Sequence, residues 1–116
     1  MGSAVADAVA ALVALDTERL VGCYADEFVF EDHSAQQIIT NRSDLRSYFT
    51  RLFSSPAVGF AVTSTAQHGD RGSAEWIWTG QRESGEPFSV RGASVFELVQ
   101  GGIAREAIYY DPAPTT

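Results

Sequence analysis

The chain has 116 residues, of which 45% are hydrophobic and 20% charged, and its formal net charge is −7 at pH 7. This length and composition predict one globular domain over residues 1–116, and no hydrophobic run approaches the roughly 20 residues of a membrane span. The acidic balance excludes the basic surface that nucleic acids and anionic membranes require, and because all eight basic residues are arginine, lysine Schiff-base chemistry is excluded too.

Helical spacing dominates the first 24 residues. Five hydrophobic residues are expected on one face of a first helix: Val5, Ala8, Val9, Leu12 and Leu15. Asp16 is a suitable N-cap for a second, short helix, because its carboxylate can accept a hydrogen bond from a free amide at the start of that helix. Leu20, Val21 and Tyr24 are expected on the buried side of this second helix.

The stretch ADEFVFEDHSA, residues 25–35, predicts a strand over residues 28–32 that ends in a charged cluster. Phenylalanine alternates with valine before three ionisable residues follow: Glu31, Asp32 and His33. Either the strand leaves the core and reaches water, or one carboxylate points into a pocket. The next segment, SAQQIITN, is expected to be a loop in which Ile38 and Ile39 pack inward.

A third helix is expected to start near Ser43 and to stop at the SSP stretch of residues 54–56. One face of it carries Leu45, Tyr48, Phe49, Leu52 and Phe53. Beyond it the hydrophobic period changes from 3.6 to 2, which predicts strands at about 58–68, 73–82, 87–99 and 103–110. The breaks HGDRG, ESGEP and QGG predict hairpin loops, and DPAPTT predicts a mobile tail.

Helices followed by a meander of long antiparallel strands predict an α+β fold. Strands of about ten residues curl strongly. A curled sheet closed by helices is expected to form a cone with an apolar interior, which suits a small-molecule pocket better than a flat sheet does.

Three segments, taken with the order of helices and strands, resemble the nuclear transport factor 2-like superfamily and, within it, the SnoaL-like group: LDTERLVGCYADEFVFEDHS, NRSDLRSYFTRLF and VRGASVFELVQGGIAREAIYYD. The resemblance covers almost the whole chain. It implies a cone-shaped α+β barrel of the cystatin-like type, often a homodimer, with a pocket inside the cone. Members include ketosteroid isomerase, polyketide cyclases, scytalone dehydratase, limonene-epoxide hydrolase and many proteins that only bind.

The same resemblance places Asp32 on the general base of ketosteroid isomerase. An aspartate at a strand end facing an apolar cavity is poorly solvated, so its pKa is expected to rise. The isomerase's oxyanion tyrosine falls near Ala8, and its protonated aspartate falls near Ser94, a weaker donor. The charged residues of the epoxide hydrolase fall near Trp76, Trp78 and Ile108. The catalytic aspartate of the cyclases also falls near Ile108. Tryptophan and isoleucine side chains do not transfer protons.

Strand alternation and the resemblance together predict the residues that face the cavity. Nine are expected there: Phe30, Asp32, Phe49, Phe53, Trp76, Trp78, Ser94, Ile108 and Tyr110. Glu106 is in phase with Tyr110 and is the only second carboxylate expected to face inward. This aromatic lining suits a flat polycyclic or aromatic ligand. The plainer alternatives are that the tryptophans fill a core and that Asp32 caps a loop or pairs with an arginine such as Arg42.

Three functions remain open. In the first, Asp32 is the general base of an isomerase, cyclase or dehydratase that acts on a hydrophobic, polyketide- or steroid-like substrate, and Tyr110 or Ser94 donates a hydrogen bond to the oxyanion. In the second, the same pocket belongs to a non-catalytic ligand-binding or accessory protein. In the third, the pocket is filled and the domain serves only as a dimerisation module.

No cofactor or metal is expected, because His33, His68 and Cys23 lack the spacing of a ligand set. His33 is expected on the surface. One cysteine allows no intrachain disulfide, which predicts a cytoplasmic location, and the alanine-rich, lysine-free composition indicates a bacterial source. A homodimer is expected through the outer face of the sheet, where alternation places Ile77, Ala93, Val95 and Val99.

Overall fold

The computed structural model describes residues 3–100 and 102–111 and has the expected α+β architecture. The elements in chain order are α1 Ala4–Val13, α2 Thr17–Val21, β1 Tyr24–Asp32, β2 Gln37–Ile39, α3 Arg42–Phe53, β3 Gly59–His68, β4 Arg71–Gln81, β5 Pro87–Val99 and β6 Gly102–Tyr110. The last four strands agree closely with the predicted ranges. Within the described residues, no helix is both long and apolar enough to cross a membrane.

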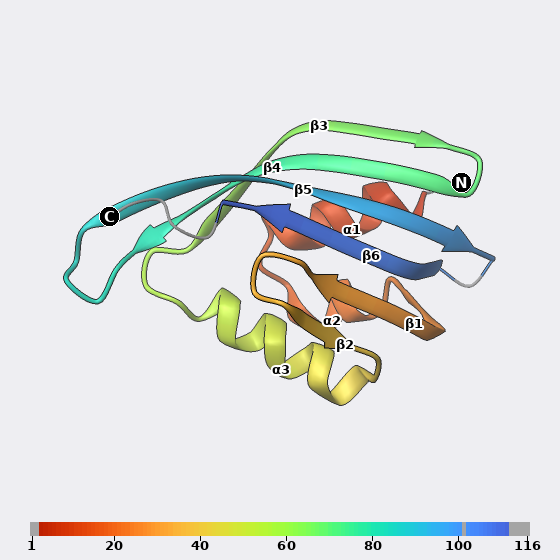
Figure 1. The fold of residues 1–116 in the computed structure, drawn as a ribbon, viewed down its shortest axis with the longest axis horizontal. Coiled ribbons are helices and arrows are strands. Elements are labelled where there is room, and N and C mark those ends of the chain that lie inside the picture. The colour runs from red at the N-terminus through yellow and green to blue at the C-terminus, as the bar shows by residue number, and fades with distance from the viewer. Residues whose placement is uncertain (1–2, 101, 112–116) are drawn as a thin grey trace.

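The six strands form one sheet in the order β2-β1-β6-β5-β4-β3. β1 and β6 run parallel and the other neighbours antiparallel. The sheet curves around the helices, with β3, β4 and β5 arching over α1 (Figure 1). It stays open, with β2 and β3 as its edges. The expected cone is therefore confirmed as a curved sheet whose hollow face is covered by helices.

Side-chain caps explain where the three helices begin. Ser3, Asp16 and Asn41 each accept a hydrogen bond from a backbone amide three residues later, as N-caps do. The prediction for Asp16 is confirmed. The first helix, however, ends at Val13, and Leu15 has a φ of 56° outside it, so the expectation that Leu15 continues the helical face is wrong.

Two local expectations between the helices are also wrong. Tyr24 is not on the second helix, because it begins β1, four residues before the predicted start of that strand. The segment expected to be a loop contains the short strand β2, which pairs with the end of β1. A strand turns alternate residues to opposite faces. Ile39 is therefore buried opposite Phe30, whereas Ile38 is 70% exposed.

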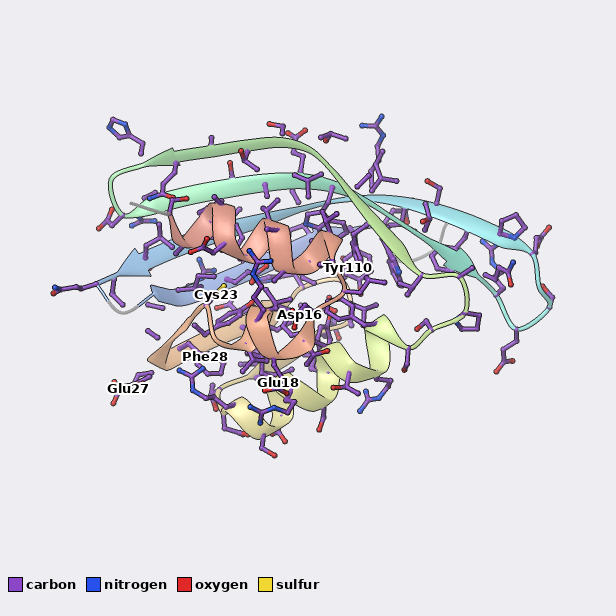
Figure 2. All side chains as sticks on the ribbon, turned by 180° about the vertical axis from the view of Figure 1, so that it is seen from behind. Asp16, Glu18, Cys23, Glu27, Phe28 and Tyr110 are labelled. Atoms are coloured by element: carbon purple, nitrogen blue, oxygen red, sulfur yellow. The ribbon has the colours of Figure 1, made fainter. Side chains whose placement is uncertain are left out.

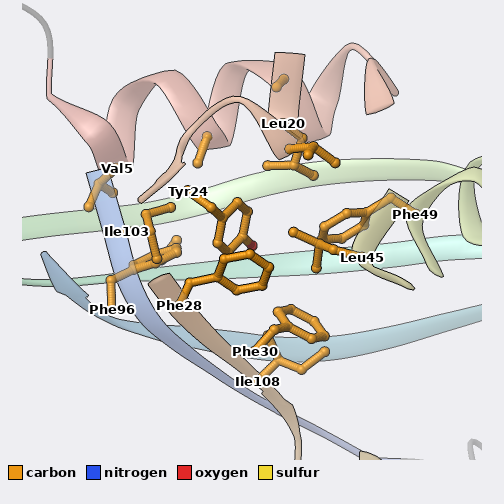
Figure 3. Packing of buried hydrophobic residues seen from close by; sticks show 14 of the residues in the cluster. Val5, Leu20, Tyr24, Phe28, Phe30, Leu45, Phe49, Phe96, Ile103 and Ile108 are labelled. Atoms are coloured by element: carbon orange, nitrogen blue, oxygen red, sulfur yellow. The ribbon is translucent and has the colours of Figure 1, made fainter. Parts of the chain in front are cut away.

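The core lies between the helices and the hollow face of the sheet (Figure 3). Tyr24, Phe28 and Phe30 enter it from β1, and Leu45 and Phe49 enter it from α3. Charged side chains such as Glu27, the neighbour of Phe28, point away from the body of the protein (Figure 2). The alternation of β1 thus supplies both the core and the surface of this part of the fold.

Gly92 decides how one aromatic side chain of the site lies. It pairs with Trp76 across β4 and β5, and a Cβ atom at Gly92 would lie 2.2 Å from Cη2 of that indole. Only a glycine lets the indole lie over β5 at this point. Two predicted features, the QGG turn at Gly101 and the tail from Pro112, fall outside the described residues.

Candidate functional site

A mainly apolar cavity lies between the hollow face of the sheet and the helices. Eight aromatic residues line it: Phe30, Tyr48, Phe49, Phe60, Trp76, Trp78, Phe96 and Tyr110. The remaining lining residues are Ala8, Val9, Leu12, Leu20, Leu52, Ala74, Ser94, Glu106 and Ile108. The cavity has about 70 Å³ of room for the centres of water-sized molecules. One water needs roughly 10–15 Å³ by that measure, so the space holds a small molecule.

Asp32 lies at the end of β1 and is only 2% exposed. Its Oδ2 accepts hydrogen bonds from the hydroxyls of Tyr48, at 2.9 Å, and Tyr110, at 3.0 Å. Its Oδ1 accepts one from the amide of Ala35, at 2.9 Å. Both tyrosines line the cavity, whereas Asp32 is not among the lining residues. The carboxylate therefore lies directly behind two hydroxyls of the cavity wall.

Both of these hydroxyls remain protonated at neutral pH. Burial raises the pKa of Tyr48 far above its ordinary value, and the charge of Asp32 raises it further. Burial and the same carboxylate raise the pKa of Tyr110 as well. Each tyrosine has one hydroxyl proton, and in this structure that proton points to Asp32.

The alternative pairing of Asp32 with Arg42 is wrong. The guanidinium of Arg42 donates to the carbonyls of Val21, Tyr24 and Ala25 at 2.8 to 3.0 Å. Its closest carboxylate oxygen, at 3.8 Å, belongs to an exposed aspartate of β1. Within the described part of the chain, no ion pair includes Asp32, whose partners are a backbone amide and neutral hydroxyls.

Glu106 is the carboxyl group that lines the cavity. It lies on β6 opposite Phe30 of β1 and is 7% exposed. The Tyr24 hydroxyl donates a short hydrogen bond to its Oε1, and Ser94 donates a second to the same carboxylate. Burial raises the pKa of Glu106 to about 6, although both hydrogen bonds act to lower it. Glu106 thus changes its charge just below neutral pH.

The two tryptophans of β4 differ in their polar contacts. Nε1 of Trp76 donates to Oγ of Ser94 at 3.0 Å, which joins this indole to Glu106 through one hydroxyl. Nε1 of Trp78 is buried and has no hydrogen-bond partner among the described residues. Trp78 packs edge to face with Tyr110, with ring centroids 5.8 Å apart. The cavity wall therefore contains one buried donor that is not used.

Seven of the nine expected residues line the cavity, and the other two lie elsewhere. Asp32 lies behind the tyrosines, and Phe53 packs against Phe49 and Phe60 without reaching the lining. The prediction did not name Tyr48 or Phe60 as site residues. Tyr48 was already expected on the buried face of its helix, but only the packing shows that its hydroxyl reaches Asp32.

Neither histidine belongs to the cavity lining within the described residues. His33 follows β1 in a turn, where its Nε2 lies 2.6 Å from Oε1 of Glu31 and its ring stacks on Tyr109. Its imidazole is 45% exposed, which confirms the expected surface position. His68 is exposed at the end of β3.

Comparison with known proteins agrees with this architecture. The sequence model of the SnoaL-like domain matches residues 5–106. A protein of Catenulispora acidiphila with a ketosteroid isomerase-like fold, in complex with trimethylamine, superimposes with a TM-score of 0.84 at 20% identity, over 96% of this chain and 87% of that one. An NTF2-like protein of Burkholderia thailandensis gives the same score and identity, over 96% and 92%.

A candidate polyketide cyclase of Pseudomonas putida has a TM-score of 0.81 at 18% identity, over 97% of this chain and 94% of that one. No functionally curated protein matches the chain. At these identities the structural matches establish the fold. The chemistry therefore has to be argued from the cavity itself.

Proposed function

Because the chain belongs to the SnoaL-like domain family, we propose that its cavity binds a small, mainly apolar molecule and that its own side chains transfer a proton on that molecule. The reaction would be of the isomerase, cyclase or dehydratase class. The observation that carries the proposal is the cluster at the wall, where a buried aspartate accepts hydrogen bonds from two cavity-lining tyrosines. The hydrogen bond from the amide of Ala35 shows that Asp32 also caps the turn after β1, as the plainer alternative expected, but a loop cap does not require the two hydroxyls of the cavity wall.

Asp32 is the proposed general base and acts through Tyr110. The substrate carbon would give its proton to the phenolic oxygen while the phenol proton moves to Oδ2, 3.0 Å away. Tyr110 stays neutral throughout, in keeping with its raised pKa, and Asp32 becomes a carboxylic acid. The reverse transfer to another carbon of the substrate completes an isomerisation and restores both groups.

The size of the cavity limits the substrate. Room for the centres of about five to seven waters favours a small molecule over the polycyclic polyketides or steroids that the family resemblance implies. A larger ligand would require partly buried lining residues such as Leu12 and Leu52 to move. The Catenulispora acidiphila protein, described with trimethylamine, supports a small molecule as the ligand of a cavity of this kind.

The proposal is tested with 3-cyclohexen-1-one, whose conversion to the conjugated ketone is followed by ultraviolet absorption. D32N and Y110F are expected to lose about 100-fold or more of any activity, as removal of a positioned base does. D26N and Y109F are the matched controls, because these residues lie on the same strands and are exposed. Full activity of D32N would overturn the catalytic role.

Non-catalytic binding is the second candidate, and one observation favours it. Asp32 already accepts three hydrogen bonds, so its carboxylate oxygens have partners before any ligand binds. Binding of the ketone by calorimetry without turnover, in a protein that the ketone protects against unfolding, would select this candidate.

We further propose a cytoplasmic, bacterial homodimer. The apolar residues Val95 and Val99 are 40% and 54% exposed on the outer face of β5, and they support pairing through that face. Light scattering at micromolar concentrations is expected to give twice 12.5 kDa. A mass of one chain over the whole concentration range would contradict the dimer.

A further inference from the structure

Among the described residues, the interior of the cone holds two buried carboxylates and no cationic side chain. Asp32 and Glu106 are 2% and 7% exposed, and no arginine or histidine is among the described residues that line the cavity. Arg105, the neighbour of Glu106 on β6, points to the other face, where it binds Glu31 and Glu97. A buried charge without an opposite partner is unfavourable. The protein therefore leaves negative charge uncompensated beside an empty space.

The polar hydrogens around the cavity are already used. The hydroxyl protons of Tyr48 and Tyr110 point to Asp32, and that of Tyr24 points to Glu106. The oxygen lone pairs of Tyr48 and Tyr110 remain available to a ligand, as does the remaining acceptor capacity of Glu106. With the exception of Nε1 of Trp78, the cavity presents acceptors, so it is suited to a ligand that donates hydrogen bonds or carries positive charge.

Aromatic faces supply the rest of the lining. Trp76, Trp78, Tyr110 and Phe60 surround one region, with centroid distances of 5.8 to 6.4 Å between neighbouring rings. The negative face of an aromatic ring attracts a cation, and desolvation strengthens this attraction. Uncharged apolar ligands would gain from the same surfaces, but they would leave the buried carboxylates without a partner.

We propose that the ligand of this cavity is a small organic cation of the alkylammonium type, held by the aromatic rings and by the carboxylate of Glu106, with the carboxylate of Asp32 attracting it from behind Tyr48 and Tyr110. This inference rests on the proposed function, because it names the class of molecule that the same cavity binds. It differs from the neutral, polyketide- or steroid-like substrate that the family resemblance implies.

The test compares choline with 3,3-dimethyl-1-butanol, which has the same shape but carbon in place of the charged nitrogen, by titration calorimetry at pH 7.5. Choline is expected to bind about tenfold more tightly or better. E106Q is expected to abolish this preference. E75Q makes the same change of charge on the exposed face of β4 and is expected to preserve it.

Acidification provides a second measurement that needs no variant. Lowering the pH from 7.5 to 5 protonates Glu106, so the affinity for choline is expected to fall while the affinity for its neutral isostere stays the same. The other titratable groups that act on this site are Asp32, Tyr24, Tyr48, Tyr110 and Cys23. The last four have raised pKa values and stay neutral throughout this range.

Each outcome separates the inference from the proposed function. Equal affinities for the two isosteres would overturn the proposal of a cationic ligand but not that of a small-molecule cavity. A preference for choline that neither E106Q nor acid changes would have the same consequence. The same holds if only 3-cyclohexen-1-one binds. If none of the three molecules binds, both proposals fail. If E75Q removes the preference for choline as completely as E106Q does, the preference comes from the overall net charge of −7 and not from the cavity. That result would also overturn the inference.

Discussion

The two faces of β1 and β6 use carboxylates in opposite ways. On the outer face, Glu31 binds Arg105 through two hydrogen bonds of 3.0 Å, and Arg105 also reaches Glu97 at 3.2 Å. On the inner face, one residue further along each strand, the hydrogen-bond donors to Asp32 and Glu106 among the described residues are all neutral. Alternation along a strand thus separates two environments within a single residue step.

The difference shows how partner and solvation set the behaviour of one functional group. The hydrogen bonds from Arg105 and His33 lower the pKa of Glu31, whereas burial raises the pKa of Glu106. Outside, the carboxylate stabilises the fold when it is charged. Inside, charging the carboxylate works against the fold, and such a group is retained where it serves binding or catalysis.

The largest effect is expected from removing the inner acid. Asp32→Ala leaves two tyrosine hydroxyls and the amide of Ala35 without their acceptor, and should lower the free energy of unfolding by about 3 kcal/mol or more. Glu31→Ala, on the outer face, should cost about 1 kcal/mol or less. Urea unfolding of both variants checks the contrast, and equal losses would remove the distinction between the faces.

A somewhat smaller effect is expected where the inner face is closely packed. Gly92→Ala places a methyl group against the Trp76 indole and should cost about 2–3 kcal/mol, because an overpacked interior has to shift. Gly59→Ala on the edge strand β3 is the control. Its Cβ would meet only the hydroxyl of Thr79, at 3.1 Å. Thermal unfolding should therefore separate the two, and an unchanged melting temperature for Gly92→Ala would mean that the indole does not occupy this position.

The dependence on pH should have opposite signs on the two faces. Glu106 has a folded pKa of about 6 against 4.5 ordinarily, so the folded state binds the proton more readily than the unfolded state. Stability is therefore lost as the pH rises from 4.5 to 6, by about 2 kcal/mol from this group. E106Q should remove that loss.

For Glu31 the folded pKa is lowered, so its contribution is present above the unfolded pKa and is lost as the pH falls through the folded one. E31Q should remove this acid-side loss. Urea unfolding of both variants and the parent between pH 2.5 and 7.5 measures these differences. The same slope in E106Q and the parent would contradict the raised pKa of Glu106.

The smallest effect distinguishes the two indoles of the inner face. Trp76→Phe loses a buried hydrogen bond to Ser94, whereas Trp78→Phe removes a donor that has no partner. The first substitution should therefore cost about 1 kcal/mol more than the second. Chemical unfolding monitored by circular dichroism avoids reliance on the fluorescence of the substituted residue. A larger cost for Trp78→Phe would show that its nitrogen does have a partner.

The sequence alone determined the class of fold, most element ranges and which strand residues share a face, because periods of 3.6 and 2 are local properties of the chain. The family resemblance added which of these faces turns inward. Together they placed Asp32 in the interior and Glu106 in phase with Tyr110. The sequence did not reveal that Gln37–Ile39 form the strand β2, or that Tyr24 belongs to β1 and not to the second helix. Three-residue strands carry little periodicity, and pairing with β1 decides whether they form.

Only the tertiary structure decided which carboxylate lines the cavity and what each one binds. Tyr48 reaches Asp32 from α3, and Tyr24 reaches Glu106 from the neighbouring strand, across 16 and 82 positions of the chain. The position of Arg105 on the outer face likewise leaves both inner acids without a cationic partner in the described part of the chain. Hydrogen bonding and desolvation depend on distances between elements, and spacing along the chain does not contain those distances.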